Sequence, residues 1–162
     1  IKDPFVSSDN CSDNKLFYAG ASIANIFVTL VREGNTMSTE LEILAWMSGL
    51  TILMWLPYIL AHIGNVGLLP ALTYKADGTP LPDWAARAKQ AHYNTIENLV
   101  PFASLIIVAH LSNATNEATA SAAWVYFWLR LSYYILYTLG VPFGRTITFA
   151  GSWIAQLFIL IV

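Results

Sequence analysis

The sequence predicts an all-α fold, a membrane-spanning four-helix bundle whose successive helices run up, down, up and down. Composition is the first observation behind this prediction, because 56% of the 162 residues are hydrophobic and only 11% are charged. A soluble domain carries about 25% charged residues, so lipid is expected to cover much of this surface. The other two observations are four long apolar stretches and the short polar links between them. Short links make successive helices antiparallel neighbours.

The first predicted span covers residues 43–63, a stretch without Asp, Glu, Lys or Arg. Its length suits a bilayer core, which a helix crosses in roughly 20 apolar residues. Pro57 lies inside this span and predicts a kink, because proline lacks the N–H that an interior helical turn uses. Ser38 or Thr39 is expected to cap the start of the span.

The other three predicted spans cover residues 86–111, 118–139 and 142–162. A loop at residues 64–83 precedes the second span, and its glycines and prolines predict irregular backbone. Gly140 ends the third span and Pro142 opens the fourth, which predicts a tight hairpin at residues 140–145.

Basic residues predict which membrane face is cytoplasmic. The 64–83 loop and the 140–145 hairpin share one side of a four-span bundle, and that side carries Lys75, Arg87, Lys89 and Arg145. The other side carries Glu40, Glu42 and Glu117. Because basic residues mark the cytoplasmic face, both connections are predicted to be cytoplasmic in an integral, multi-pass membrane protein.

Residues 1–36 are predicted to be an N-terminal extension of the transmembrane domain at residues 37–162. The stretch 16–31 is uncharged and moderately apolar, but it is short for a span. The chain begins at Ile1, whereas Met37 followed by Ser, Thr and Glu resembles a natural start. An uncleaved signal and a fusion remnant are open alternatives, and an interfacial helix is the expectation.

Two charged residues lie deep inside the predicted spans, away from the span ends: Glu97 in the second and Arg130 in the third. An ionisable group that faces lipid is costly, so both are expected to point into the bundle. We expect them to face each other there, in direct contact or through a bound ligand, since pairing keeps both charged. The alternative is a purely structural pair that locks the two helices together.

Polar residues share one face of the second span. Asn94 follows Arg87 by seven residues and Glu97 follows Asn94 by three, and such spacings place side chains on one helical stripe. The third span repeats this spacing with Arg130, Tyr133 or Tyr134, and Tyr137. Cations, an amide and a phenol around a carboxylate suit a small, polar, multiply charged ligand.

Other classes of function find no support in the sequence. The net charge of −2 supplies no basic field, so nucleic acid is not an expected partner. No metal site is expected, because His62, His92 and His110 fall at or near span ends and Cys11 is the only cysteine.

Two motifs resemble those of the MAPEG family, the membrane-associated proteins in eicosanoid and glutathione metabolism. The first motif comprises Ala91-His92, Asn94, Glu97-Asn98 and Pro101-Phe102. The second begins at Arg130 and continues through Tyr137 to Gly140, Pro142 and Arg145. The resemblance covers residues 37–162 and implies a homotrimer of four-helix bundles. It also implies that glutathione binds between subunits, near the cytoplasmic face.

The resemblance implies roles for individual residues. The positions that match glutathione-contacting residues of the family are Asn94, Glu97, Arg130, Tyr137 and Arg145. Arg87, on the same stripe as Asn94, is expected to join this site. Arg145 matches the arginine that helps to stabilise the glutathione thiolate, so it is the expected catalytic residue. The implied function is a glutathione-dependent transferase or peroxidase that acts on lipophilic electrophiles.

Gln90 and Tyr93 depart from the family pattern, because some family enzymes carry Arg at these positions. Phe149 stands where some members have Tyr. Fewer cations would hold the two carboxylates of glutathione less firmly. Two alternatives to the enzyme therefore stay open: a non-catalytic membrane subunit, and a protein that binds a lipid or quinone-like ligand on the same bundle.

Labelling of single cysteines tests the predicted topology. In a Cys11→Ser background, Lys75→Cys is expected to react only from the cytoplasmic face and Glu117→Cys only from the opposite face. The measurement is maleimide labelling of right-side-out and inverted vesicles. Labelling of both positions from the same side would contradict the topology, since one span separates them.

Overall fold

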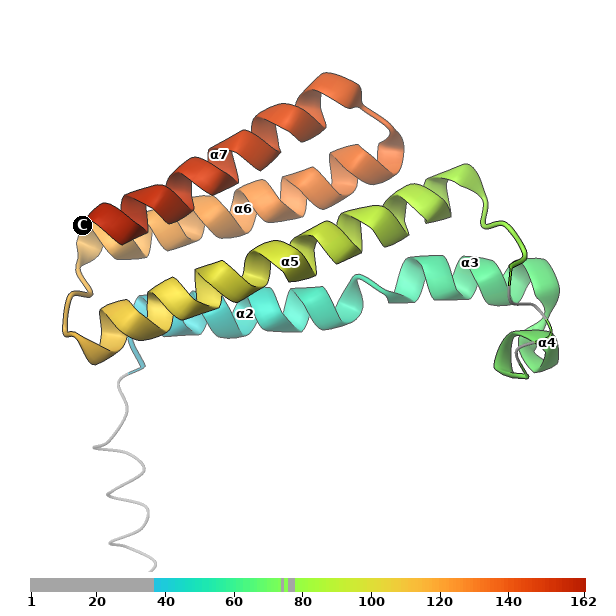
Figure 1. The fold of residues 1–162 in the computed structure, drawn as a ribbon, viewed down its shortest axis with the longest axis horizontal. Helices are drawn as coiled ribbons and strands as arrows, with labels where there is room; N and C mark the ends of the chain where they lie inside the picture. Colours follow the sequence, from blue (N-terminus) through green and yellow to red (C-terminus); the bar gives the residue numbers. More distant parts are fainter. Residues whose placement is uncertain (1–36, 74, 76–77) are drawn as a thin grey trace, which may run out of the picture. The chain divides into compact units, whose positions relative to one another are not determined.

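The computed structural model describes residues 37–73, 75 and 78–162, and this part of the chain is all helical. The interfacial helix expected within residues 1–36 lies outside the described residues. Figure 1 shows the long helices running antiparallel in succession. The six described helices are α2 (Thr39–Leu53), α3 (Leu56–Val66), α4 (Leu68–Leu72), α5 (Asp83–Leu111), α6 (Glu117–Leu139) and α7 (Pro142–Ile161).

The first predicted span consists of two helices, α2 and α3, that follow one another with a break at residues 54–55. The break comes just before Pro57, which lies in the first turn of α3, where its missing N–H does no harm. The predicted kink is therefore a complete interruption, slightly earlier in the chain. The predicted cap is confirmed, because the Ser38 side chain accepts a hydrogen bond from the Leu41 amide at 3.5 Å.

The 64–83 connection contains more helix than the sequence predicts. Helix α3 continues to Val66, and the five-residue helix α4 follows at Leu68–Leu72. Gly67, at φ 88°, separates the two helices in a backbone conformation that favours glycine. Pro70 does not prevent α4, because it lies within the first turn, which needs no amide donor.

Three segments are long and apolar enough to cross a bilayer: Thr39–Val66, Asp83–Leu111 and Pro142–Ile161. The fourth predicted span, α6, has 23 residues, but its composition is too polar to be counted with them. It carries Glu117, Arg130 and four tyrosines. Helix α6 contacts α2, α5 and α7, so protein rather than lipid surrounds much of its surface.

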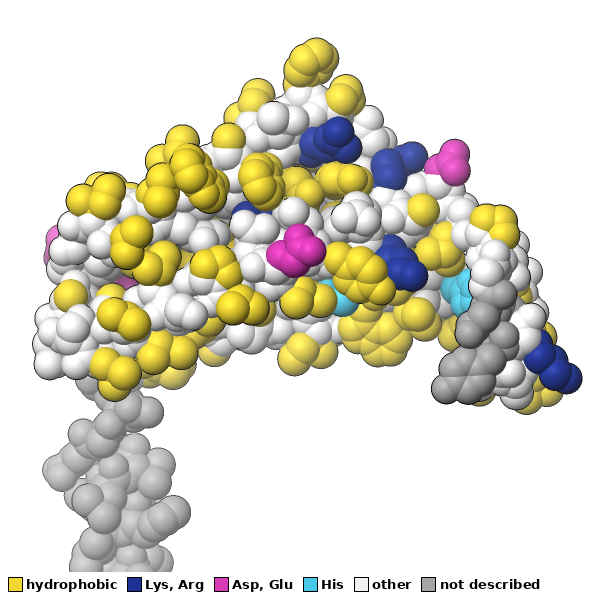
Figure 2. Space-filling view, in the orientation of Figure 1, with side chains coloured by type: hydrophobic (Ala, Val, Ile, Leu, Met, Phe, Trp, Pro, Cys, Tyr) yellow, Lys and Arg dark blue, Asp and Glu magenta, His cyan; other side chains and the backbone are white. Residues whose placement is uncertain are grey.

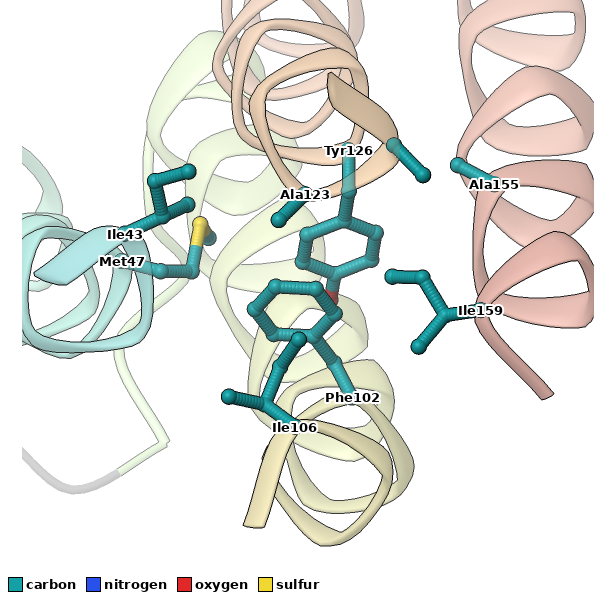
Figure 3. Packing of buried hydrophobic residues seen from close by; sticks show 9 residues of the cluster. Ile43, Met47, Phe102, Ile106, Ala123, Tyr126, Ala155 and Ile159 are labelled. Carbon is teal, nitrogen blue, oxygen red and sulfur yellow. The ribbon is translucent and has the colours of Figure 1, made fainter. Parts of the chain in front are cut away.

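The core lies where α2, α5, α6 and α7 meet. Phe102 and Tyr126 stack at its centre, with ring centroids 3.9 Å apart and ring planes 11° apart. Figure 3 shows Ile43 and Met47 on one side of this stack and Ile159 on the other. Such close aromatic packing fixes how α5 and α6 are rotated against each other.

The surface of the helices is strongly apolar. Phe143 is 83% exposed and Ile161 is 81% exposed, which suits contact with lipid rather than water. Figure 2 shows hydrophobic side chains over much of the visible face. Lys and Arg gather toward the end where α5 begins and where the α6–α7 turn lies.

A buried carboxylate joins the two helix starts at the opposite end of the bundle. The Thr119 hydroxyl donates a hydrogen bond to Glu40, which is only 3% exposed. Thr119 also accepts a hydrogen bond from the Asn116 amide and so completes a capping box at the start of α6. The carboxylate of Glu40 thus lies where the positive end of the α6 dipole favours an anion.

Replacing Thr119→Val should destabilise the protein by about 1–3 kcal/mol, because a buried carboxylate loses its donor and α6 loses part of its cap. Thr119→Ser keeps the hydroxyl and is the matched control, with stability expected near that of the parent protein. Both are measured by chemical unfolding in detergent. Equal stability of Thr119→Val and the parent protein would mean that this contact contributes nothing.

Candidate functional site

Arg130 of α6 is fully buried within the bundle, with 0% of its surface exposed. Three aromatic rings surround its guanidinium carbon, those of Tyr126 at 5.5 Å, Tyr133 at 5.6 Å and Phe149 at 5.3 Å from carbon to ring centroid. These distances allow cation–π attraction, which is strongest where water is excluded. Helices α6 and α7 together therefore supply an aromatic enclosure for one cation.

Asn94 of α5 makes the hydrogen bond that ties this cation to a third helix. Arg130 Nη1 donates to Asn94 Oδ1 at 3.0 Å. Nε and Nη2 of the same guanidinium have no hydrogen-bond partner among the described residues. Asn98, one turn further along α5, donates to the Asn94 carbonyl oxygen at 2.8 Å. The guanidinium thus retains unused donors behind Asn94.

A pocket of about 270 Å³ opens beside this pair. Its lining, which defines the polar pocket below, consists of Asn94, Tyr133, Tyr137, Arg145, Thr146 and Phe149. At the rim, the guanidinium carbon of Arg145 lies 4.9 Å from the centroid of the Tyr137 ring. The Arg145 side chain is exposed. The polar pocket therefore has an accessible cation and a phenol at its rim, with a buried cation behind Asn94.

The structure brings together four of the six residues that the sequence predicts for the site. Asn94, Tyr137 and Arg145 line the polar pocket, and Arg130 lies behind it, bonded to Asn94. Glu97 is exposed on α5. Within the described part of the chain no hydrogen bond or ion pair joins Glu97 to Arg130, because Asn94 occupies that position instead. The predicted direct pair is therefore wrong within the single chain, and a link through a ligand stays a prediction.

Arg87, the sixth predicted residue, is not among the residues that line the polar pocket. Its Nε donates to the carbonyl oxygen of Thr138 at 3.1 Å. Arg87 therefore contacts the last turn of α6, near the hairpin that leads to α7.

Sequence reasoning missed Thr146 and the part that Phe149 plays in enclosing Arg130. The spacing of Arg145 and Phe149, four residues apart on α7, was the available signal for a shared helix face. The sequence did not decide whether Tyr133 or Tyr134 belongs to the site, and the structure distinguishes them. Tyr133 lines the polar pocket, whereas the Tyr134 hydroxyl donates to the Met54 carbonyl oxygen at 3.0 Å.

A second, mostly apolar cavity of about 450 Å³ lies between α5 and α7. We call it the apolar groove, and its lining is Asn98, Pro101, Leu105, Trp153, Gln156, Leu157 and Leu160. Asn98 Nδ2 is 3.4 Å from Asn94 Oδ1, so the apolar groove begins one helical turn from the polar pocket. Gln156 is 6% exposed, and its Nε2 atom lacks a partner among the described residues.

Comparison with known protein families matches residues 43–162, well over half of the chain, to the MAPEG family. The chain belongs to the MAPEG family. Comparisons with curated proteins and with solved structures found no match. The matched MAPEG region contains every residue of the polar pocket and the apolar groove. Family membership and the candidate spans identify an integral, multi-pass membrane protein.

Replacing Asn94→Leu should destabilise this MAPEG protein by about 1.5–3 kcal/mol, because a hydrogen bond to a buried charged group is lost. Asn94→Asp keeps an acceptor beside Arg130 and is expected to be at least as stable as the parent protein. Unfolding in detergent without any ligand measures both. If Asn94→Leu unfolds like the parent protein, the Asn94–Arg130 contact is not what holds the buried guanidinium.

Proposed function

We propose that this MAPEG protein is a glutathione-dependent transferase or peroxidase that acts on lipophilic electrophiles. The observation that carries the proposal is the arrangement of the polar pocket. An exposed guanidinium, that of Arg145, lies over the Tyr137 ring at the rim. Asn94 lines the same pocket and bonds to the buried Arg130 behind it. A small anionic ligand with hydrogen-bonding groups fits such a rim.

In the proposed reaction, Arg145 stabilises the thiolate of glutathione. A guanidinium close to sulfur favours the anion and so lowers the pKa of the thiol. The thiolate donates its electron pair to an electrophilic carbon, a carbon–sulfur bond forms, and the leaving group departs with its own electron pair. The thiol proton passes to solvent at the exposed rim, so no further reactant is needed for transfer.

In this proposal Tyr137 positions Arg145, and Asn94 and Glu97 contact the ligand. The Tyr137 ring keeps the Arg145 guanidinium in place through cation–π attraction. The Asn94 amide nitrogen donates to no other described residue, because Arg130 bonds to the amide oxygen. Glu97, one turn along α5, would pair with the ammonium group of glutathione.

We further propose that the functional unit is a homotrimer. An exposed carboxylate inside an apolar span, such as Glu97, costs about 2.5–3.5 kcal/mol or more if lipid surrounds it. Assembly places such a group against protein or against a ligand shared between subunits. The number three comes from the family resemblance, and native mass measurement in mild detergent decides it.

The apolar groove supplies a place for the electrophile. It lies between α5 and α7 and begins one turn from the polar pocket, and its mostly apolar lining suits a lipophilic molecule. A lipophilic substrate in the groove could present its reactive carbon toward Asn98, the residue nearest to Asn94.

A second candidate function is binding of a lipid or quinone-like ligand without catalysis. The observation that favours it is the amide nitrogen of Gln156, a buried donor without a partner in the described part of the chain, which a ligand carbonyl would satisfy. This candidate requires the apolar groove but not the thiolate.

Glutathione binding and conjugation test the proposal directly. Calorimetry on the detergent-purified protein should detect glutathione binding, and ultraviolet absorbance should detect the bound thiolate. Arg145→Met is expected to lower kcat/KM for conjugation by about 100- to 1,000-fold, the effect typical of losing one group that stabilises developing charge. Lys89→Met removes a cation outside the polar pocket and is the matched control.

The outcomes separate the candidates. Absence of glutathione binding by the parent protein would refute the enzyme and leave the lipid- or quinone-binding candidate. Binding with neither conjugation of a lipophilic electrophile nor reduction of a lipid hydroperoxide would favour a non-catalytic subunit.

A further inference from the structure

The side chain of Arg87 reaches from α5 across to the end of α6. Its Nε donates to the Thr138 carbonyl oxygen at 3.1 Å, a contact between residues 51 positions apart in the chain. Thr138 lies in the last turn of α6, where carbonyl groups have no helical partner and the helix dipole is negative. A guanidinium is a favourable partner for both features.

Gly140 brings the backbone of the turn against the same guanidinium. It ends α6 at φ 80°, a left-handed conformation that favours glycine. A Cβ atom at this position would lie 3.3 Å from Arg87 Nε and 3.4 Å from Arg87 Cζ. The guanidinium therefore packs on the turn as well as bonding to it, and any larger residue at 140 would push against it.

The turn held in this way determines where α7 begins. The Val141 amide bonds back to the Leu136 carbonyl at 2.9 Å, and the Arg145 amide bonds to the Val141 carbonyl at 3.3 Å. Arg145 is thus fixed in the first turn of α7, a few residues beyond the contact of Arg87. No ion pair engages Arg87 among the described residues, so its charge is directed at the turn.

We propose that Arg87 is a positioning residue that holds the α6–α7 turn and, through it, sets the place of Arg145 at the rim of the polar pocket. This differs from direct contact between Arg87 and glutathione, the role that the sequence predicts. The effect of Arg87 on the glutathione thiol rests on the proposed function, whereas its contact with the α6–α7 turn does not.

The first measurement needs no ligand. Hydrogen exchange of residues 137–146 is compared in the parent protein, Arg87→Met, Arg87→Lys and the control Lys89→Met. Loss of a helix-end cation contact should speed exchange in this segment by about threefold to tenfold in Arg87→Met, with smaller change in Arg87→Lys and none in Lys89→Met. Unchanged exchange in Arg87→Met would overturn the proposal.

The second measurement follows the bound thiol. Arg87→Met should move ionisation of bound glutathione to higher pH and lower kcat/KM at neutral pH by about threefold to tenfold, while the Kd for glutathione stays within a factor of about two. Arg87→Lys should recover part of the ionisation. Gly140→Ala should also raise the pH at which bound glutathione ionises. The double variant Gly140→Ala with Arg87→Met should shift this pH by less than the sum of the two single shifts.

Each remaining outcome is decisive. A loss of glutathione affinity with normal exchange of the turn would make Arg87 a ligand contact and overturn the proposal. Faster exchange with unchanged thiol ionisation would make its role structural alone and also overturn it. If the parent protein binds no glutathione, the proposed function fails, and hydrogen exchange still decides whether Arg87 holds the first turn of α7.

Discussion

Burial of the Arg130 guanidinium is the constraint on which the rest of the structure depends. A charge without exposed surface costs several kcal/mol unless other groups compensate for it. Compensation comes from three rings and one amide, supplied by α5, α6 and α7. The face of α6 that carries Arg130 must therefore pack against α5 and α7. The same groups that compensate the charge, Asn94, Tyr133 and Phe149, also line the polar pocket, so the site is a direct product of burying this cation.

The hydroxyl groups of α6 serve the irregular backbone of the other helices. Tyr126 donates to the Asn98 carbonyl at 3.1 Å, next to Glu97, whose own carbonyl loses its helical donor because Pro101 has no N–H. Tyr134 donates to the Met54 carbonyl at the break between α2 and α3. A membrane interior offers no water to satisfy such groups, so protein has to do so. The tyrosines that make α6 more polar than the apolar candidate spans thus donate to backbone carbonyls of its neighbours, including one at the break between α2 and α3.

Local signals made much of this fold predictable, and contacts between helices account for what was missed. Ser38, Gly140 and the proline that opens α7 mark helix ends by their own backbone chemistry, and each lies where the sequence predicts. The partner of Arg130 is different, because Asn94 and Glu97 share one stripe and helical spacing cannot tell which of them reaches it. The rotation of α5 against α6, fixed by packing of the Phe102–Tyr126 stack, decides this, and no local pattern encodes that packing.

Glu97 shows that a single chain does not balance its own charges. Its carboxylate is exposed on an apolar helix, while two nitrogen atoms of Arg130 lack partners inside the bundle. Neither condition is favourable in lipid, where unpaired charge is expensive. Glutathione carries both an ammonium group and carboxylates, so a molecule bound between subunits would meet an acid and cations at the same time. Within a single chain Arg130 bonds to Asn94 and not to Glu97. In the proposed trimer Glu97 would pair with the ammonium group of glutathione instead.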